Sequence, residues 1–247
     1  MKDIIVRYLI FTLGLYCLSL GMVLIVTSSL GTTPISSMNY ILSLNTPLTL
    51  GIATFIFNMA LIVGQLILAR RFASRKDYVE ILLQIPFSIP FSIFIDFNMW
   101  LLDGFQITSY SMALSVLVLG CLMQGVGVSL EIKPNVAMMS AEGFVKYTSL
   151  RFGKTFGTTK VLFDVALVIG AAALSWAMAG KIDGIREGTV VAALMTGYIV
   201  TFMTTRIFTR SNMRKLSFGL MKYIIHNYEI FTNTCVTVGC FNWHGTH

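Results

Sequence analysis

Four ionisable side chains, Glu131, Glu142, Lys160 and Asp164, stand among long apolar runs in a chain of which only 12% of the residues are charged. A carboxylate in such surroundings is costly, so it is by default a candidate for a binding site or a proton relay. Lys160 and Asp164 are four residues apart, a spacing that places both side chains on one face of a helix. These residues therefore predict a polar site inside an apolar protein.

Structural roles are the alternative for each of these residues. Glu142 can act as part of a helix cap, where the helix dipole favours its carboxylate. Lys160 and Asp164 can form an ion pair whose lysine extends toward the cytoplasm. Glu131 can be an interfacial acid. The sequence leaves these alternatives open.

The elements that position these residues are predicted to be membrane-spanning helices. The chain has 247 residues and is 55% hydrophobic, whereas soluble domains carry about 25% charged residues. Apolar runs of roughly 20 residues are long enough to cross a bilayer, and in lipid such runs must be helical. We predict an all-α, polytopic membrane protein with six transmembrane helices, at about 5–27, 50–70, 79–102, 108–130, 156–179 and 188–208. Two apolar segments, 33–44 and 138–149, are too short to cross alone.

The basic residues predict the orientation of these spans. If the predicted spans cross the membrane in turn, all but three of the 18 Lys and Arg residues lie on the same side of it. The positive-inside rule then places both termini in the cytoplasm. The net charge of +7 is explained by this topology, so the sequence does not favour nucleic acid as a partner.

An internal repeat divides the chain. Shifting the sequence by 106 residues aligns it with itself, including four pairs of glycines: Gly14 and Gly120, Gly21 and Gly127, Gly51 and Gly157, and Gly64 and Gly170. Each half contains three spans, an odd number, so the second half is predicted to enter the membrane from the opposite side, as in many transporters. We therefore predict repeats at 1–105 and 106–209, followed by a poorly ordered cytoplasmic tail at 210–247.

The two short segments occupy equivalent places in the repeats and are predicted to be re-entrant or broken half-helices. Thr33 can cap a helix that starts at Pro34, and Ser140 can cap its counterpart. Their N-termini would present unpaired N–H groups and positive dipole ends to a central site. The repeat also aligns Ser36 with Glu142 and Asn58 with Asp164. Ser36 and Asn58, together with the capping residue Thr33, are therefore added to the predicted substrate-binding residues.

Five segments together resemble the YczE/YitT-like family of bacterial integral membrane proteins: GMVLIVTSSLGTTPISSMNYILS, GVSLEI, AEGFVK, FGTTKVLFDVALV and REGTVVAALMTG. The resemblance covers about residues 5–208. It implies a protein of the bacterial cytoplasmic (inner) membrane, but little about its chemistry. It places Gly143, together with Glu131, Glu142, Lys160 and Asp164, on family motifs. Ser140 and Ala141 stand where the family pattern leads us to expect Pro-Gly.

These features predict a transporter of a small polar or anionic solute, in which a carboxylate takes up a coupling proton. The main alternative is a non-transporting scaffold or accessory protein with a cytoplasmic partner, and an ion channel is a third interpretation. No enzyme activity is predicted, because all three histidines lie in the tail and no phosphate-binding glycine loop is present. No cofactor or metal is predicted, since the tail residues Cys235, Cys240, His244 and His247 match no strong zinc spacing. The expected partners are the bilayer and the solute, and the sequence leaves a homo-oligomer open.

Overall fold

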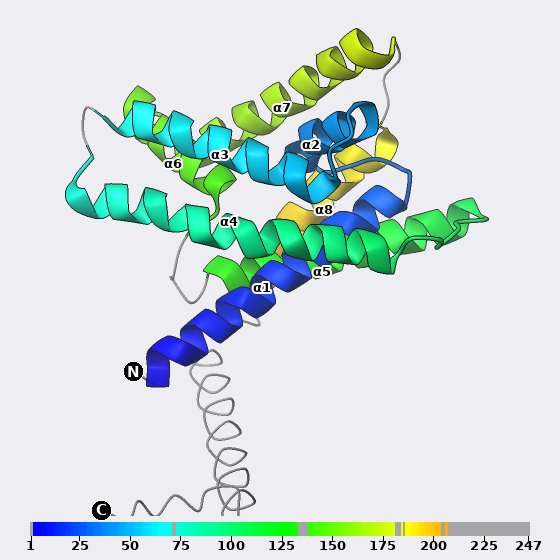
Figure 1. Cartoon of the computed structure of the whole chain (residues 1–247), viewed down its shortest axis with the longest axis horizontal. Coiled ribbons are helices and arrows are strands. Elements are labelled where there is room, and N and C mark those ends of the chain that lie inside the picture. The colour runs from blue at the N-terminus through cyan, green and yellow to red at the C-terminus, as the bar shows by residue number, and fades with distance from the viewer. Residues whose placement is uncertain are drawn as a thin grey trace, which may run out of the picture.

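The computed structural model describes residues 2–70, 73–132, 138–180, 184, 186–203 and 206. These residues form eight helices and no strand (Figure 1), which confirms the all-α prediction. The helices are α1 (Lys2–Thr27), α2 (Pro34–Asn45), α3 (Leu50–Ala69), α4 (Arg75–Leu101), α5 (Tyr110–Ile132), α6 (Ser140–Phe152), α7 (Phe156–Ala179) and α8 (Glu187–Phe202).

Five of these helices are long and apolar enough to cross a membrane, as expected of a multi-pass membrane protein. They are α1, α3, α4, α5 and α7, and they correspond to the first five predicted spans. The sixth predicted span, 188–208, falls on α8, whose described residues form a shorter helix of 16 residues. The short segments predicted at 33–44 and 138–149 form α2 and α6, of 12 and 13 residues. The predicted tail at 210–247 lies outside the described residues.

Helices α1 and α5 pack against each other along most of their length, below α3 and α7 in the view of Figure 1. Glycines allow this close approach. A Cβ added to Gly21 would lie 2.4 Å from the backbone nitrogen of Gln124, and a Cβ added to Gly127 would lie 2.4 Å from that of Leu18. Each backbone therefore comes close to the other helix at a glycine, where it has no side chain of its own.

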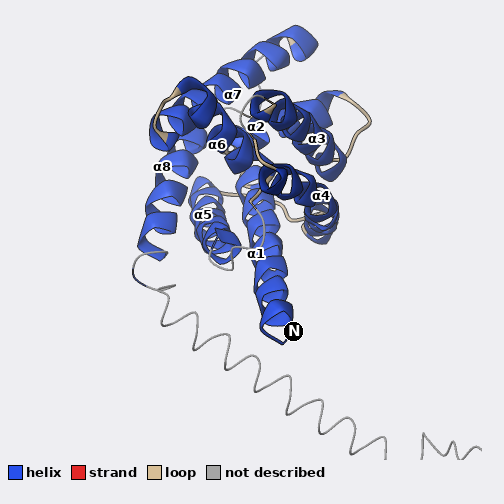
Figure 2. Cartoon of the chain, turned by 90° about the vertical axis from the view of Figure 1, so that its left-hand side faces the viewer, coloured by secondary structure: helices blue, strands red, loops and turns tan. Residues whose placement is uncertain are grey.

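The other helices lie beside this pair and above it in the view of Figure 2. Helix α4 contacts α1 and α3, and α8 contacts α5. The short helices pack across the bundle, with α2 against α7 and α6 against α3. Two polar ties fix this arrangement. The Asp96 carboxylate of α4 accepts hydrogen bonds from Thr49 Oγ1 and the Gly51 N–H, both at 2.7 Å, at the start of α3. At the start of α8, the Gly188 N–H donates to the Leu30 carbonyl at 2.9 Å.

Candidate functional site

A cavity of about 380 Å³ lies where the two short helices begin. Its lining includes residues from every helix of the described chain. Six of the predicted substrate-binding residues line it: Thr33, Ser36, Asn58, Glu142, Lys160 and Asp164. Residues far apart in the sequence, from both proposed repeats, are therefore brought together.

Helix α2 begins at this cavity with the predicted cap. Thr33 is the N-cap residue and Pro34 follows it as the first helical residue. Thr33 Oγ1 accepts a hydrogen bond from the Ser36 N–H at 3.3 Å, and Ser36 Oγ accepts one from the Thr33 N–H at 3.0 Å. This reciprocal capping box satisfies two N–H groups that the helix itself leaves unpaired. The predicted cap at Thr33 is confirmed.

Helix α6 begins differently, and the predicted cap at Ser140 is wrong. Met139 is the N-cap residue, and its N–H donates to Glu131 Oε1 at 3.1 Å. Ser140 is already helical, and its hydroxyl donates to Asn58 Oδ1 at 2.6 Å. The carboxylate from the end of α5 thus takes over the role of acceptor at this terminus. Glu131 is only 3% exposed and lies behind the first turn of α6 rather than in the cavity lining.

Lys160 and Asp164 form an ion pair in the cavity wall. Lys160 Nζ lies 2.6 Å from Asp164 Oδ1, and both side chains remain about a quarter exposed. The pair is the structural alternative considered for these residues, yet its position leaves both groups within reach of a bound molecule. Glu142 lies close enough for its charge to interact with both members of the pair.

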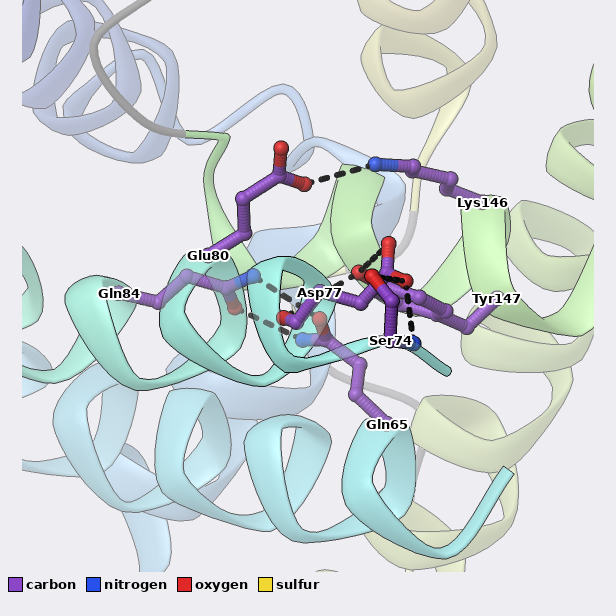
Figure 3. A network of polar contacts seen from close by, with 7 residues as sticks. All are labelled: Gln65, Ser74, Asp77, Glu80, Gln84, Lys146 and Tyr147. Atoms are coloured by element: carbon purple, nitrogen blue, oxygen red, sulfur yellow. Dashed lines mark hydrogen bonds and ion pairs between the residues drawn. The ribbon is translucent and has the colours of Figure 1, made fainter. Parts of the chain in front are cut away.

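Gly143, the remaining predicted site residue, lies outside the cavity lining. It packs against an amide pair between α3 and α4, and a Cβ added to it would lie 2.5 Å from Gln65 Oε1. Gln65 and Gln84 donate to each other's carbonyl oxygens at 2.8 and 2.9 Å, as Figure 3 shows. Gln65 Nε2 also donates to the Ser140 carbonyl at 3.0 Å. Gly143 therefore has a packing role, in which it lets α6 approach this pair.

We predict that Gln65→Leu destabilises the protein by about 1–3 kcal/mol, because it leaves the buried amide of Gln84 without its partner. The double variant Gln65→Leu/Gln84→Leu is expected to be less destabilised than the sum of the two single variants, since it removes both polar groups together. Unfolding of the four proteins in detergent gives the coupling energy. Additive losses would contradict the reciprocal pair.

Sequence reasoning missed four polar residues in the lining, Asn39, Thr54, Gln124 and Thr196. Asn39 Nδ2 donates to Thr54 Oγ1 at 3.2 Å, whereas Asn39 Oδ1 has no hydrogen-bond partner in the described chain. Asn58 Nδ2 and Gln124 Oε1 are likewise buried without a partner among the described residues. Asn39 follows Ser36 by three residues, which places both on one helix face. That spacing was the available signal for Asn39.

Lys146, one of the basic residues that predict the orientation of the spans, pairs with Glu80 of α4 at 2.9 Å (Figure 3). Its charge thereby ties α6 to α4. Lys133, another of these basic residues, lies outside the described residues. The tail residues considered for zinc, Cys235, Cys240, His244 and His247, also lie outside them.

Comparison with curated proteins and with solved structures finds no match to the sequence. One family does match, over residues 5–205, a range that contains the cavity lining, helix α1 from Ile5 onward and the whole of the other seven described helices. Because this match covers most of the 247 residues, the chain belongs to the family described as "Family of unknown function (DUF6198)".

Proposed function

We propose that this protein is a transporter that carries a small polar solute across the bacterial cytoplasmic membrane, and that the cavity is its binding site. The observation that carries the proposal is the convergence of Glu142 and the Lys160–Asp164 pair on a cavity of about 380 Å³. This volume lies within the range of roughly 300–1,000 Å³ of small-molecule sites. Transporters commonly bind their solutes where interrupted helices begin near the centre of the bilayer.

The proposal includes an inverted repeat, for which four observations speak. Helices α2 and α6 start at residues 34 and 140, and α3 and α7 at 50 and 156, so both pairs follow the offset of the sequence repeat. In the glycine contacts of α1 with α5, Gly14 meets Gly127 and Gly21 meets Gly120. Contacts that run in opposite directions along the two helices imply an antiparallel pair. In the proposed repeat, α2 corresponds to α6 and α3 to α7. The contact of α2 with α7 then has its counterpart in the contact of α6 with α3.

The proposed repeat gives α8 the role of a sixth span, continued by residues beyond Phe202, with both termini in the cytoplasm. It also suggests a route into the cavity. Helix α3 packs on α4, but α7 makes no extended packing contact with α8 among the described residues. Phe156 and Lys160 of α7 and Gly197 of α8 line the cavity on this side. We propose that the solute enters between α7 and α8 from the cytoplasmic side. Movement of one repeat against the other would then open the cavity to the opposite side of the membrane.

Proton coupling is proposed to depend on Glu142. This residue lines the cavity and, within the described chain, makes no ion pair. A carboxylate in such a place can bind a proton or a solute in turn, as intramembrane acids do in many transporters. The narrower relationship to the YczE/YitT-like proteins, based on the segments quoted above, remains part of this proposal.

The scaffold hypothesis predicts different surroundings for the same acidic residues. It expects Glu142 and Asp164 to be packed and paired, with no function for a cavity beside them. Glu131 fits that description, since it is buried and bonded to Met139. Asp164 is paired with Lys160, as a scaffold would require. Glu142 lines the cavity without an ion pair in the described chain, and this difference favours transport as the proposed function, with absence of enzyme activity as its corollary.

Solid-supported-membrane electrophysiology on proteoliposomes tests the proposal. The wild-type protein is exposed to pH jumps and to a panel of small cations, anions and neutral polar metabolites. A solute-dependent current, absent from protein-free liposomes, supports transport. Silence across the panel from protein shown to be folded, combined with capture of a cytoplasmic partner, would favour the scaffold.

A further inference from the structure

We infer that the solute is an amphipathic organic cation, with an ammonium or amidinium head that donates N–H groups and with an apolar body. This inference rests on the proposed function and names the class of solute. It replaces the anionic solute that the sequence analysis allowed with a cationic one. Three independent features of the cavity carry it.

The first feature is the charge of the cavity wall. The wall contains two acids, Glu142 and Asp164, and one base, Lys160. Asp164 already neutralises Lys160 at 2.6 Å, so Glu142 supplies the remaining charge. An anion would therefore approach the uncompensated carboxylate of Glu142, whereas a cation would be attracted by it.

The second feature is that the helix N-termini offer an anion few free donors. At α2, the Thr33 and Ser36 N–H groups are bonded within the capping box, and Pro34 has no N–H. At α6, the N–H of the capping residue Met139 is bonded to Glu131. The protein's own oxygens thus occupy the Thr33 and Ser36 donors at α2, and at α6 they occupy the Met139 donor. A positive helix end that is satisfied in this way gives little further attraction to an anion.

The third feature is the set of unpaired polar atoms in the lining. Asn39 Oδ1 and Gln124 Oε1 are buried acceptors without a protein partner in the described chain, and Asn58 Nδ2 is a donor of the same kind. Asn39 and Asn58 are only 1% and 4% exposed. Buried polar groups are normally hydrogen-bonded. Together with the carboxylate of Glu142, acceptors predominate, which suits a ligand rich in N–H donors.

The remaining lining determines the body of the solute. Much of it is apolar, and its larger side chains are Leu18, Met22, Phe91, Val128 and Phe156. A fully hydrated inorganic cation would not use this surface. An organic cation would place its head against Glu142 and its apolar part against the aromatic rings, which also favour a cation over their faces.

Charged thiol reagents test the sign of the cavity without requiring knowledge of the solute. Ala193 lines the cavity and is exposed, and Gln106 lies in an exposed loop outside it. Ala193→Cys and Gln106→Cys are introduced separately into the otherwise native chain. Each protein is treated in detergent with a cationic trimethylammonium methanethiosulfonate or an anionic sulfonate methanethiosulfonate. Peptide mass spectrometry then gives the rate of labelling at the introduced cysteine.

We expect the ratio of cationic to anionic labelling rates to be about tenfold higher at position 193 than at position 106. In Ala193→Cys/Glu142→Gln this ratio should fall toward that of the loop. Should Ala193→Cys fail to fold, Thr196→Cys probes the same cavity. A ratio at 193 equal to or below that at 106, or one that Glu142→Gln leaves unchanged, would overturn the inferred cation preference while leaving transport standing. Labelling at 106 but at neither cavity position would instead overturn the proposed binding cavity itself.

Discussion

Glu142→Gln is expected to reduce the pH-driven current of proteoliposomes at least tenfold while the protein remains folded. The amide keeps the size of the side chain but can neither bind a proton nor carry a negative charge. Glu142 lines the cavity and pairs with no base in the described chain, so its loss removes both coupling and attraction for the solute without breaking a salt bridge. The current is measured with the solute and pH jump that give the largest wild-type response.

Glu80→Gln is the matched control for this prediction. Glu80 is exposed, lies outside the cavity lining and pairs with Lys146 at 2.9 Å. The substitution therefore removes an exposed ion pair, which contributes at most about 1 kcal/mol to stability. Its current should stay close to that of the wild type. Wild-type current in folded Glu142→Gln would exclude Glu142 from the transport path. Loss of current in both variants would point to a general effect of lost charge.

The position of the site could be predicted from the sequence because it depends on rules that act locally. Intramembrane charge marked Glu142 and Asp164, and the four-residue spacing paired Lys160 with Asp164, which the structure bears out at 2.6 Å. The offset of the repeat then added Ser36 and Asn58, which contact the same cavity. Charge, helical spacing and repetition do not require knowledge of how distant helices pack.

The errors arose where packing between helices decides the outcome. Gly143 is adjacent to Glu142, but successive residues of a helix point about 100° apart, so it meets Gln65 and Gln84 instead of the cavity. Those two glutamines are neutral and isolated in the sequence, and only the contact of α3 with α4 makes them partners. The two short helices give the same lesson. Thr33 caps α2 as predicted, but at α6 a carboxylate from α5 displaces the expected hydroxyl of Ser140.

The fold as a whole could be predicted more completely, because long apolar runs leave helices as the only structure compatible with lipid. The eight described helices fall within a few residues of the predicted segments. Length criteria alone do not identify α8 as a span, since its described residues number only 16. The assignment of α8 as a sixth span depends on the proposed repeat.

The close contact of α1 and α5 leads to the largest expected effect on stability. A Cβ at Gly127 would lie 2.4 Å from the backbone nitrogen of Leu18 and 2.9 Å from the Gly14 carbonyl oxygen. Both neighbours are backbone atoms, so no change of rotamer can relieve the overlap, and the two helices must move apart. We therefore expect Gly127→Leu to cost about 3 kcal/mol, near the upper end of overpacking effects. Size-exclusion chromatography and thermal unfolding in detergent would detect the loss of folded protein.

Gly157→Leu provides the control, because it makes the same substitution in α7 at a glycine whose added Cβ would meet no atom within 4 Å. Its effect should stay within about 1 kcal/mol and can be stabilising, since leucine favours a helix more than glycine does. Gly21→Leu tests the symmetry of the contact, because its Cβ would lie 2.4 Å from the backbone nitrogen of Gln124. If α1 and α5 are the antiparallel pair of an inverted repeat, Gly21→Leu and Gly127→Leu occupy equivalent places and should cause similar losses. A large loss for one variant and tolerance of the other would contradict that equivalence, because an antiparallel pair related by exchange of the repeats must be constrained equally at both crossings.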